Sequence, residues 1–258
     1  MSSTDLRCAV VVGGASGIGA AIVRALAKDG VAVTVADRNL ELAKSVATEL
    51  GSPHDAAEVD VADEESVQKL FESAQARRGR LDIAVNSAGL SVAGSITDLS
   101  IEKFKRVVDV CLTGAFSVIK HAARSMDDGG VIISLSSLNA RQPGTGLSAY
   151  CSAKAGLAML TQVAALELAE RGIRVNAIAP GIVMTPLTTP SMSVPGLQDD
   201  YLANTPLGRS GTPEEIADAA VYMTHASWLT GENLDLNGGA HLVRYPDLLG
   251  HFQRASAI

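Results

Sequence analysis

The sequence predicts an α/β protein with a doubly wound parallel sheet and helices on both of its faces. Strand-like apolar runs alternate with helical patterns along the whole 258-residue chain, which is the order that such a sheet requires. The strand runs are apolar at successive positions, as expected when both faces of a strand are covered. A glycine cluster follows the first strand and opens the first helix. Because no linker, repeat or low-complexity tract interrupts the pattern, we expect residues 1–258 to form a single domain.

Each expected strand is a short apolar run, and each expected helix is a longer segment with helical spacing of its apolar residues. The strands are expected at residues 8–12, 31–36, 56–59, 81–85, 131–135, 173–178 and 233–236. The helices are expected at residues 17–28, 40–50, 64–78, 101–126, 148–171 and 213–224. Residues 185–209 are rich in Pro, Thr and Ser and are too long for an ordinary connection, so we interpret them as a substrate loop. A tail, residues 240–258, follows the last motif.

The composition limits the partners and the compartment. The net charge of −7 argues against nucleic acid as a partner, because phosphate binding needs a basic surface. No apolar run approaches the length of a membrane span and the polar start of the chain is no leader, so no membrane partner is expected. The three cysteines form no CxxC pair, which favours a reducing, cytoplasmic compartment. The five histidines are scattered, and no metal site is predicted.

The glycine cluster lies in residues 10–19, which read VVVGGASGIG. Gly13 permits a sharp turn out of the strand, while Gly17 and Gly19 let backbone amides approach a pyrophosphate at the helix N-terminus. Ser16 and Ile18 complete this predicted dinucleotide-binding turn. The spacing differs from the usual GxGxxG, so the alternative is a glycine-rich turn that binds no ligand.

The end of the second strand carries a carboxylate, Asp37. A carboxylate at this position can accept hydrogen bonds from the adenosine ribose and repels a 2′-phosphate, which favours NAD over NADP. Arg38 is the opposing feature, because a guanidinium can bind that phosphate. The alternative for Asp37 is a helix N-cap or an exposed loop acid.

A tyrosine and a lysine stand four residues apart at Tyr150 and Lys154, and Ser137 precedes the tyrosine by thirteen residues. Side chains four residues apart share one face of a helix. An ammonium group beside a phenol favours the phenolate, so the two residues predict an acid/base pair. The alternatives are a tyrosine that is only a polar tip at a surface and a serine that only ends a strand.

Taken together, these residues resemble the short-chain dehydrogenase/reductase family, whose fold is Rossmann-like, along nearly the whole chain. No single motif is decisive, but their order and spacing are specific. The matches are VGGASGIG at 12–19, Asp37, Asp60-Val61, Asn86-Ser87-Ala88-Gly89, Ser137, Tyr150 with Lys154, Asn176, Pro180-Gly181 and Thr185.

The resemblance implies a role for each matched residue. Tyr150 would be the general base in alcohol oxidation, Ser137 would hold the substrate oxygen, and Lys154 would also bind the nicotinamide ribose. The remaining contacts with the cofactor would come from Asp60 and Val61 at the adenine, from Asn86, Ala88 and Gly89 after the fourth strand, and from Pro180, Gly181, Ile182 and Thr185 at the carboxamide. Asn176 is left out of the site, because it is also interpretable as a turn residue.

The chain departs from the family pattern at three positions. Val12 stands where the family usually has Thr, and Ser87 where it has Asn. Since both partners of that pair have changed, neither leaves the other unpaired. The third departure is Cys111, at the position of the family's catalytic asparagine, which shapes a helix kink whose carbonyl holds a proton-relay water. A carbonyl does not depend on the side chain, so Cys111 either preserves or slows this relay. We interpret Cys111 as a small buried apolar residue rather than a nucleophile.

The predicted function is hydride transfer between NAD and a nonpolar secondary alcohol or ketone of an alicyclic, terpenoid or steroid-like kind. The pocket is expected to be mostly aliphatic and uncharged, formed by Leu90, Ser91, Leu138, Asn139, Leu147, Ile182 and the substrate loop. The alternatives are a dihydrodiol or sugar-alcohol dehydrogenase of the same fold, and a non-catalytic dinucleotide-sensing regulator. The resemblance implies a homotetramer. The apolar residues of the tail predict that it packs on a neighbouring subunit.

Overall fold

All seven strands lie in one parallel sheet with the order β3-β2-β1-β4-β5-β6-β7. The computed structural model describes residues 6–256; residues 1–5 and 257–258 of the expected domain, including the last two residues of the tail, lie outside this range. The strands are β1 Cys8–Val12, β2 Ala32–Asp37, β3 Asp55–Glu58, β4 Ile83–Asn86, β5 Val131–Leu135, β6 Arg174–Pro180 and β7 Asn233–Leu236. The predicted doubly wound sheet is therefore confirmed.

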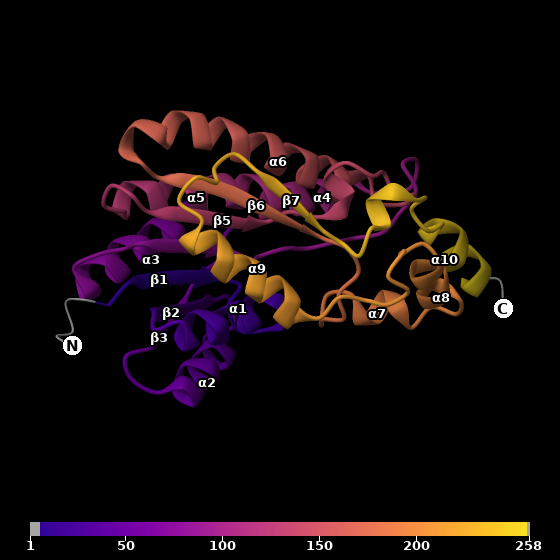
Figure 1. Ribbon diagram of the computed structural model, residues 1–258. Coiled ribbons are helices and arrows are strands. Elements are labelled where there is room, and N and C mark those ends of the chain that lie inside the picture. The colour runs from indigo at the N-terminus through magenta and orange to yellow at the C-terminus, as the bar shows by residue number, and fades with distance from the viewer. Residues whose placement is uncertain (1–5, 257–258) are drawn as a thin grey trace.

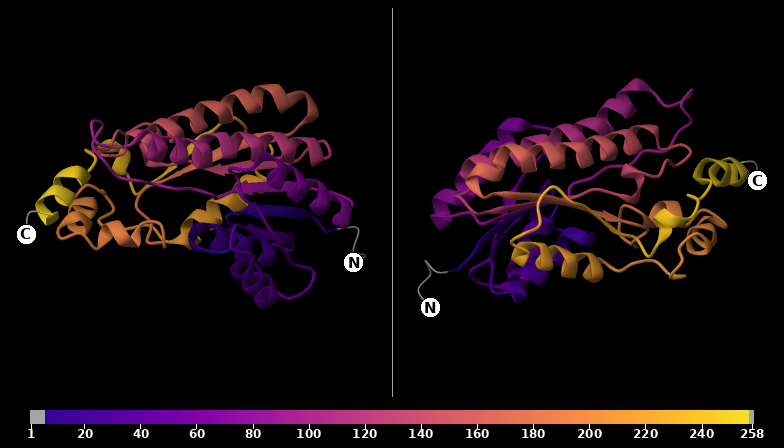
Figure 2. Two further views of the ribbon diagram at one scale, coloured as in Figure 1. Left: turned by 180° about the vertical axis from the view of Figure 1, so that it is seen from behind. Right: turned by 45° about the horizontal axis from the view of Figure 1, so that its top comes forward.

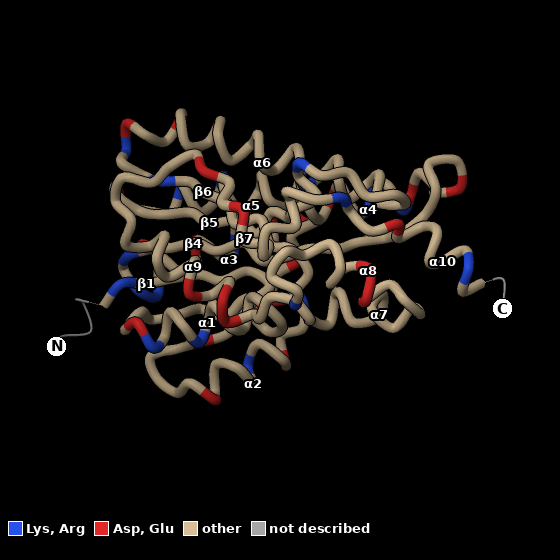
Figure 3. The backbone as a smooth tube through the Cα atoms, turned by 45° about the vertical axis from the view of Figure 1, so that its right-hand side comes forward, with Lys and Arg blue, Asp and Glu red and all other residues tan. Residues whose placement is uncertain are grey.

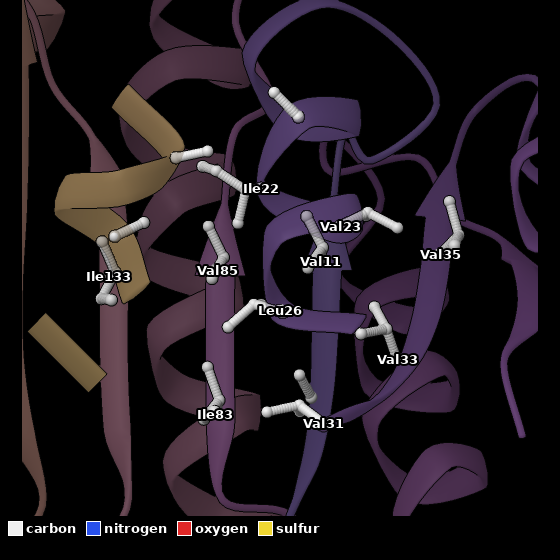
Figure 4. Packing of buried hydrophobic residues seen from close by; sticks show 14 of the residues in the cluster. Val11, Ile22, Val23, Leu26, Val31, Val33, Val35, Ile83, Val85 and Ile133 are labelled. Carbon is white, nitrogen blue, oxygen red and sulfur yellow. The ribbon is translucent and has the colours of Figure 1, made fainter. Parts of the chain in front are cut away.

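Helices cover both faces of the sheet (Figures 1 and 2). One face packs against α1 Gly17–Lys28, α2 Leu40–Leu50 and α9 Pro213–His225, and the other against α3 Glu64–Arg78, α5 Gly114–Ser125 and α6 Ser148–Leu168. Within β1, Val11 enters the first core and Val10 enters the second. Successive side chains of a strand point to opposite faces, which explains why these strands are apolar without alternation. Figure 4 shows Ile22, Val23 and Leu26 of α1 lying over the central strands.

The order of the strands places a crevice at one end of the sheet. The chain adds β2 and β3 on one side of β1, and then crosses to add β4 and the remaining strands on the other side. The connections that leave β1 and β4 at their carboxyl ends therefore diverge. A parallel sheet binds its ligands at such a switch point. Both predicted site motifs, the glycine turn and the segment after Asn86, begin there.

The structure corrects several expected elements. The long helix over 101–126 consists of α4 Ile101–Val108, a π-helical turn Asp109–Thr113 and α5. The substrate loop contains two short helices, α7 Thr189–Met192 and α8 Leu197–Ala203, and the tail ends in α10 Leu248–Ser256. No helix among residues 6–256 combines the length and the apolar character needed to cross a membrane. Over the same residues, no group of three or more His, Cys, Asp and Glu side chains has the arrangement of a metal site.

Candidate active site

The glycine turn is packed too closely for side chains. Gly13 and Gly17 have positive φ angles of 72° and 51°, which L side chains rarely adopt. A Cβ on Gly13 would lie 2.8 Å from the backbone nitrogen of Ala88, and one on Gly19 would lie 2.0 Å from the carbonyl oxygen of Gly13. Gly19 therefore allows α1 to pack against the turn that precedes it. The glycines bring the start of α1 against β4 and leave backbone amides accessible.

The N-terminus of α1 has donors that the turn does not satisfy. Ser16 is the N-cap residue, and its side chain makes no capping hydrogen bond. The first amides of a helix have no partner within the helix and carry partial positive charge, so they suit a pyrophosphate. This arrangement fits a dinucleotide, because the cradle that glycine leaves open is the place where its phosphates would lie.

A cleft of about 360 Å³ extends from this turn across the carboxyl ends of β1, β2 and β4. Leu90, which is expected in the substrate pocket, borders this cleft instead. Arg106 and Val110 also border it, and no sequence motif predicts either of them here. The wall consists of Val12, Gly13, Ser16, Gly17, Ile18, Asp37, Arg38, Val59, Asp60, Val61, Ser87, Ala88, Gly89, Leu90, Arg106, Val110, Thr185, Pro186 and Leu187.

Asp37 borders the cleft and also supports the glycine turn. One carboxylate oxygen accepts a hydrogen bond from the amide of Ala15 at 3.2 Å, and the other accepts one from the amide of Asn39 at 3.0 Å. The N-cap of α2 is Asn39, whose side chain accepts from the amide of Leu42. Asp37 is therefore not the helix cap that the sequence left as an alternative.

Two asparagines from the matched motifs lie away from the cleft wall. Asn86 is buried, and its side-chain oxygen accepts from the amide of Ala88 at 3.2 Å, which orders the turn after β4. We expected Asn86 to line the cofactor site, but the structure places it beneath that turn, outside the wall. Asn176 joins β6 to the segment before β7, donating to the carbonyl of Leu229 and accepting from the amide of Glu232. Asn176 thus lies within β6 and not in a turn, and its contacts agree with leaving it out of the site.

The structure brings Ser137, Tyr150 and Lys154 together where β5 ends and α6 begins. Ser137 follows β5, and its hydroxyl accepts from the amide of Asn139 at 3.1 Å. Tyr150 lies in the first turn of α6, and Lys154 lies one turn later with its amine 5.6 Å from the centre of the tyrosine ring. Lys154 is 2% exposed and donates to the carbonyl of Leu135 at 2.6 Å. The lysine is thus held beside the phenol by the end of β5.

Ser137 and Tyr150 border a second cavity of about 120 Å³. Leu187 lies in the walls of both this cavity and the dinucleotide cleft, so the two adjoin. Pro180, the last residue of β6, and the following Gly181 and Ile182 border the second cavity rather than the cleft. Its wall consists of Ser91, Ser137, Leu138, Asn139, Leu147, Tyr150, Pro180, Gly181, Ile182, Leu187, Thr188, Ser191, Met192, Tyr201, Tyr245 and Leu248.

The C-terminal tail lines the second cavity of its own chain, and its packing on a neighbouring subunit stays a prediction. Tyr245 and Leu248 of the tail line the cavity, together with Tyr201 of α8. Asp200 of α8 holds the tail, because its carboxylate contacts Arg244 at 2.8 Å and His251 at 3.2 Å. Figure 3 shows the acidic segment of α8 near the tail and α10. The apolar tail residues were a usable signal, but the sequence could not say which subunit they cover.

The three departures from the family pattern are accommodated around the same turn. Val12 is buried, and its carbonyl accepts from the amide of Ser87 at 2.8 Å, so a backbone bond joins the ends of β1 and β4 without the usual side-chain pair. Cys111 lies in the π-helical turn and is 1% exposed. Its thiol accepts from the amide of Leu90 at 3.3 Å and donates to the carbonyl of Leu90 at 3.2 Å. Cys111 is thus buried, as expected, but it also makes polar contacts.

A dinucleotide cleft that adjoins a cavity containing serine and tyrosine hydroxyls defines a class of oxidoreductases. The family model described as "Enoyl-(Acyl carrier protein) reductase" matches residues 13–241. The chain belongs to the short-chain dehydrogenase/reductase family and is an oxidoreductase of that family, whose fold implies a nicotinamide dinucleotide cofactor.

Two relatives and one solved structure illustrate this membership. The chain is 38% identical to 3beta-hydroxysteroid dehydrogenase 1 of Eggerthella lenta over 93% of this chain and 95% of that protein. It is 41% identical to cis-4-hydroxycyclohexanecarboxylate dehydrogenase of Sinomonas cyclohexanicum, over 90% and 96% of the two chains. A short-chain type dehydrogenase/reductase from Mycobacterium ulcerans superposes with a TM-score of 0.92 at 32% identity, covering 96% and 94%. The chain spans only 44% of an uncharacterized relative from Sinorhizobium fredii, to which it is 39% identical.

Proposed function

We propose that this protein is an NAD-dependent dehydrogenase that interconverts a nonpolar cyclic secondary alcohol and its ketone. One observation carries the proposal: the hydroxyl-bearing residues Ser137 and Tyr150 share the wall of a mostly nonpolar cavity, and this cavity adjoins the dinucleotide cleft at Leu187. A substrate held there would lie beside the end of a dinucleotide whose pyrophosphate rests on the start of α1.

The proposed roles of the residues follow from their positions. When bound, the nicotinamide supplies the hydride acceptor for alcohol oxidation. Tyr150, as phenolate, takes the hydroxyl proton of the alcohol while the carbinol carbon loses its hydride. Ser137 donates a hydrogen bond to the substrate oxygen. Lys154 holds positive charge beside the phenolate, and the bond to the carbonyl of Leu135 keeps its amine in place. In ketone reduction, the proton returns from Tyr150 to the substrate oxygen.

NAD is the proposed cofactor because Asp37 brings a carboxylate to the wall of the cleft. The ribose hydroxyls can donate to this carboxylate, whereas a 2′-phosphate would face its charge. Arg38 borders the same cleft and favours the alternative, NADP. The other proposed dinucleotide contacts are those expected from the sequence, with Asn86 and Gly19 acting through the shape of the turns.

The size of the cavity supports a small cyclic substrate. The second cavity holds about 120 Å³, whereas sites for drug-sized ligands hold roughly 300–1,000 Å³. A single ring suits this volume, and a steroid-like substrate would require a larger cavity. The two relatives are named for a hydroxysteroid and a hydroxycyclohexanecarboxylate, both of which are ring alcohols.

The proposal is tested by measuring NADH formation with cyclic secondary alcohols, and NADH consumption with the matching ketones, against NADP and NADPH. Tyr150→Phe is expected to lower kcat by at least about a hundredfold while it leaves NAD affinity within about twofold. Tyr222→Phe is the matched control, because Tyr222 is exposed on α9. If the native protein binds NADH but turns over no alcohol or ketone, the sensing-regulator alternative is correct. If sugar alcohols are the better substrates, the alternative of a sugar-alcohol dehydrogenase is correct.

We also propose that the protein acts in the cytoplasm as a homotetramer. The exposed faces of α5 and α6 carry Phe116, Met159, Val163 and Leu166. A row of exposed apolar side chains on adjacent helices favours association with another copy. Multi-angle light scattering after gel filtration tests this assembly, and a mass of one subunit at micromolar concentration would contradict it.

A further inference from the structure

Two tyrosines that line the proposed substrate cavity are paired through their hydroxyl groups. Tyr201 in α8 and Tyr245 in the tail are 44 positions apart in the chain, and their hydroxyl oxygens lie 2.6 Å from each other. Their rings pack edge to face, with centres 5.5 Å apart and planes at 85°. Both line the cavity that Ser137 and Tyr150 border. The proposed mechanism uses neither of them.

The pair retains one proton that its mutual hydrogen bond does not use. Two phenols carry two protons, and the bond between them consumes one. Asn139 also hydrogen-bonds the hydroxyl of Tyr245, and because this bond lowers the pKa of Tyr245 the amide is the donor, so it uses neither phenolic proton. Within residues 6–256, the mutual bond is the one hydrogen bond that uses a phenolic proton of the pair. Burial raises the pKa of Tyr201 to about 12 and the pKa of Tyr245 well above its usual value, so both protons are present at neutral pH. The remaining proton can be donated to an acceptor that enters the cavity.

The surrounding structure holds the pair in a defined position. A Cβ on Gly144 would lie 2.6 Å from the ring of Tyr245, so the ring packs directly on that glycine. On either side of Tyr245, Arg244 contacts Asp200 at 2.8 Å and Asp247 accepts from Thr145 at 3.0 Å. A donor that is already oriented loses little entropy when it binds a ligand.

The chemistry of the wall defines the group that the pair would accept. Among the described residues that line the cavity there is no Lys, Arg or His. A carboxylate would enter without a compensating charge, whereas a hydroxyl, ether or carbonyl oxygen needs only the free proton. We propose that Tyr201 and Tyr245 form a second polar anchor, which binds an uncharged oxygen atom of the substrate that takes no part in the reaction. This inference rests on the proposed function. The preferred substrates are then neutral rings with two oxygen functions.

The experiment compares cyclohexanol with the 1,2-, 1,3- and 1,4-cyclohexanediols, measuring kcat/KM with NAD. After correction for the two equivalent hydroxyls of each diol, the native protein is expected to prefer at least one diol by roughly five- to tenfold, the worth of one neutral hydrogen bond. The double variant Tyr201→Phe/Tyr245→Phe is expected to bring this ratio to about one. A general loss of activity would lower kcat/KM for the diol and for cyclohexanol by the same factor and would leave the ratio unaffected. cis-4-Hydroxycyclohexanecarboxylate is expected to be a poor substrate. The matched control, Tyr222→Phe, keeps the native ratio.

A second variant perturbs the pair without removing either hydroxyl. Gly144→Ala displaces the ring of Tyr245 and is expected to lower the diol ratio at least threefold. A diol ratio near one in the native protein, or an unchanged ratio in the folded double variant, overturns the inference while oxidation of cyclohexanol still supports the proposed function. If no alcohol is oxidised, the proposed function fails. Calorimetric titration of the diols into native and double-variant protein with NAD then tests the tyrosine pair by itself, and equal affinities in the two proteins would overturn the inference.

Discussion

The thiol of Cys111 contacts both backbone polar groups of Leu90, accepting from the amide at 3.3 Å and donating to the carbonyl at 3.2 Å. This contact joins the π-helical turn between α4 and α5 to the segment that follows β4. Leu90 lies in the wall of the dinucleotide cleft. A residue that the family pattern makes an asparagine is thus replaced by a smaller one that still bonds the backbone.

Cys111→Ala is expected to lower the free energy of unfolding by about 1–2 kcal/mol, because it removes two weak hydrogen bonds and leaves a small void. It is also expected to lower kcat, since the cleft wall loses its link to the π-helical turn. Cys111→Ser is the matched control that keeps a donor and an acceptor. Urea unfolding and steady-state kinetics measure both effects, and an alanine variant as stable and active as the serine variant would refute this role.

Asp37→Asn is expected to raise the affinity for NADP relative to NAD by roughly tenfold, or about 1.4 kcal/mol. The substitution removes the charge that would oppose a 2′-phosphate and keeps one acceptor oxygen, which can serve the amide of Ala15 or that of Asn39 but not both. Asp37→Ala removes both, and a comparison of the two separates charge from support of the turn. Fluorescence titration with NADH and NADPH gives the ratio of affinities. If the ratio does not change in either variant, Asp37 does not select the cofactor. Adding Arg38→Ala to Asp37→Asn is expected to reverse most of the gain.

Gly19→Ala is expected to destabilise the protein by about 1–3 kcal/mol or more, because its Cβ would lie 2.0 Å from the carbonyl oxygen of Gly13. The backbone of the turn has to shift to admit it, which also disturbs the phosphate cradle. Gly89→Ala is the control for stability, since no atom lies within 4 Å of a Cβ there. Urea midpoints for the two variants check the prediction, which fails if they are equally stable.

The stability of the fold is expected to fall in alkali through Tyr201. Its folded pKa is raised to about 12 by burial, from an ordinary value of 10.0. The folded state therefore binds the phenolic proton more tightly than the unfolded chain does. This contribution is fully present below about pH 10 and is lost as the pH rises toward about 12, up to about 2–3 kcal/mol. Urea midpoints at about pH 8 and about pH 11 measure the loss, and Tyr201→Phe is expected to reduce it. An equal loss in both proteins would assign it to other groups.

Motifs that act through neighbouring positions could be predicted from the sequence, whereas contacts between distant segments could not. The turn around Gly13 and the helix face shared by Tyr150 and Lys154 each depend on spacing within about ten residues, and the structure places them as expected. The prediction that Leu90 lines the substrate pocket is wrong, because Leu90 borders the dinucleotide cleft and the next residue, Ser91, borders the second cavity. Spacing in the sequence does not resolve a difference of one residue. Spacing alone could not show that Asn86 supports the turn from below.

The sequence by itself determined the doubly wound sheet and the family, because each depends on the order of elements and on local patterns of apolar residues and glycine. Only the tertiary structure decided what closes the second cavity. The tail could have covered its own subunit or another, since its apolar residues favour burial anywhere. The contacts of Asp200 with Arg244 and His251 set the direction of the tail, and they bring Tyr245 against Tyr201. Such a pairing depends on the path of the chain in space, which no local pattern encodes.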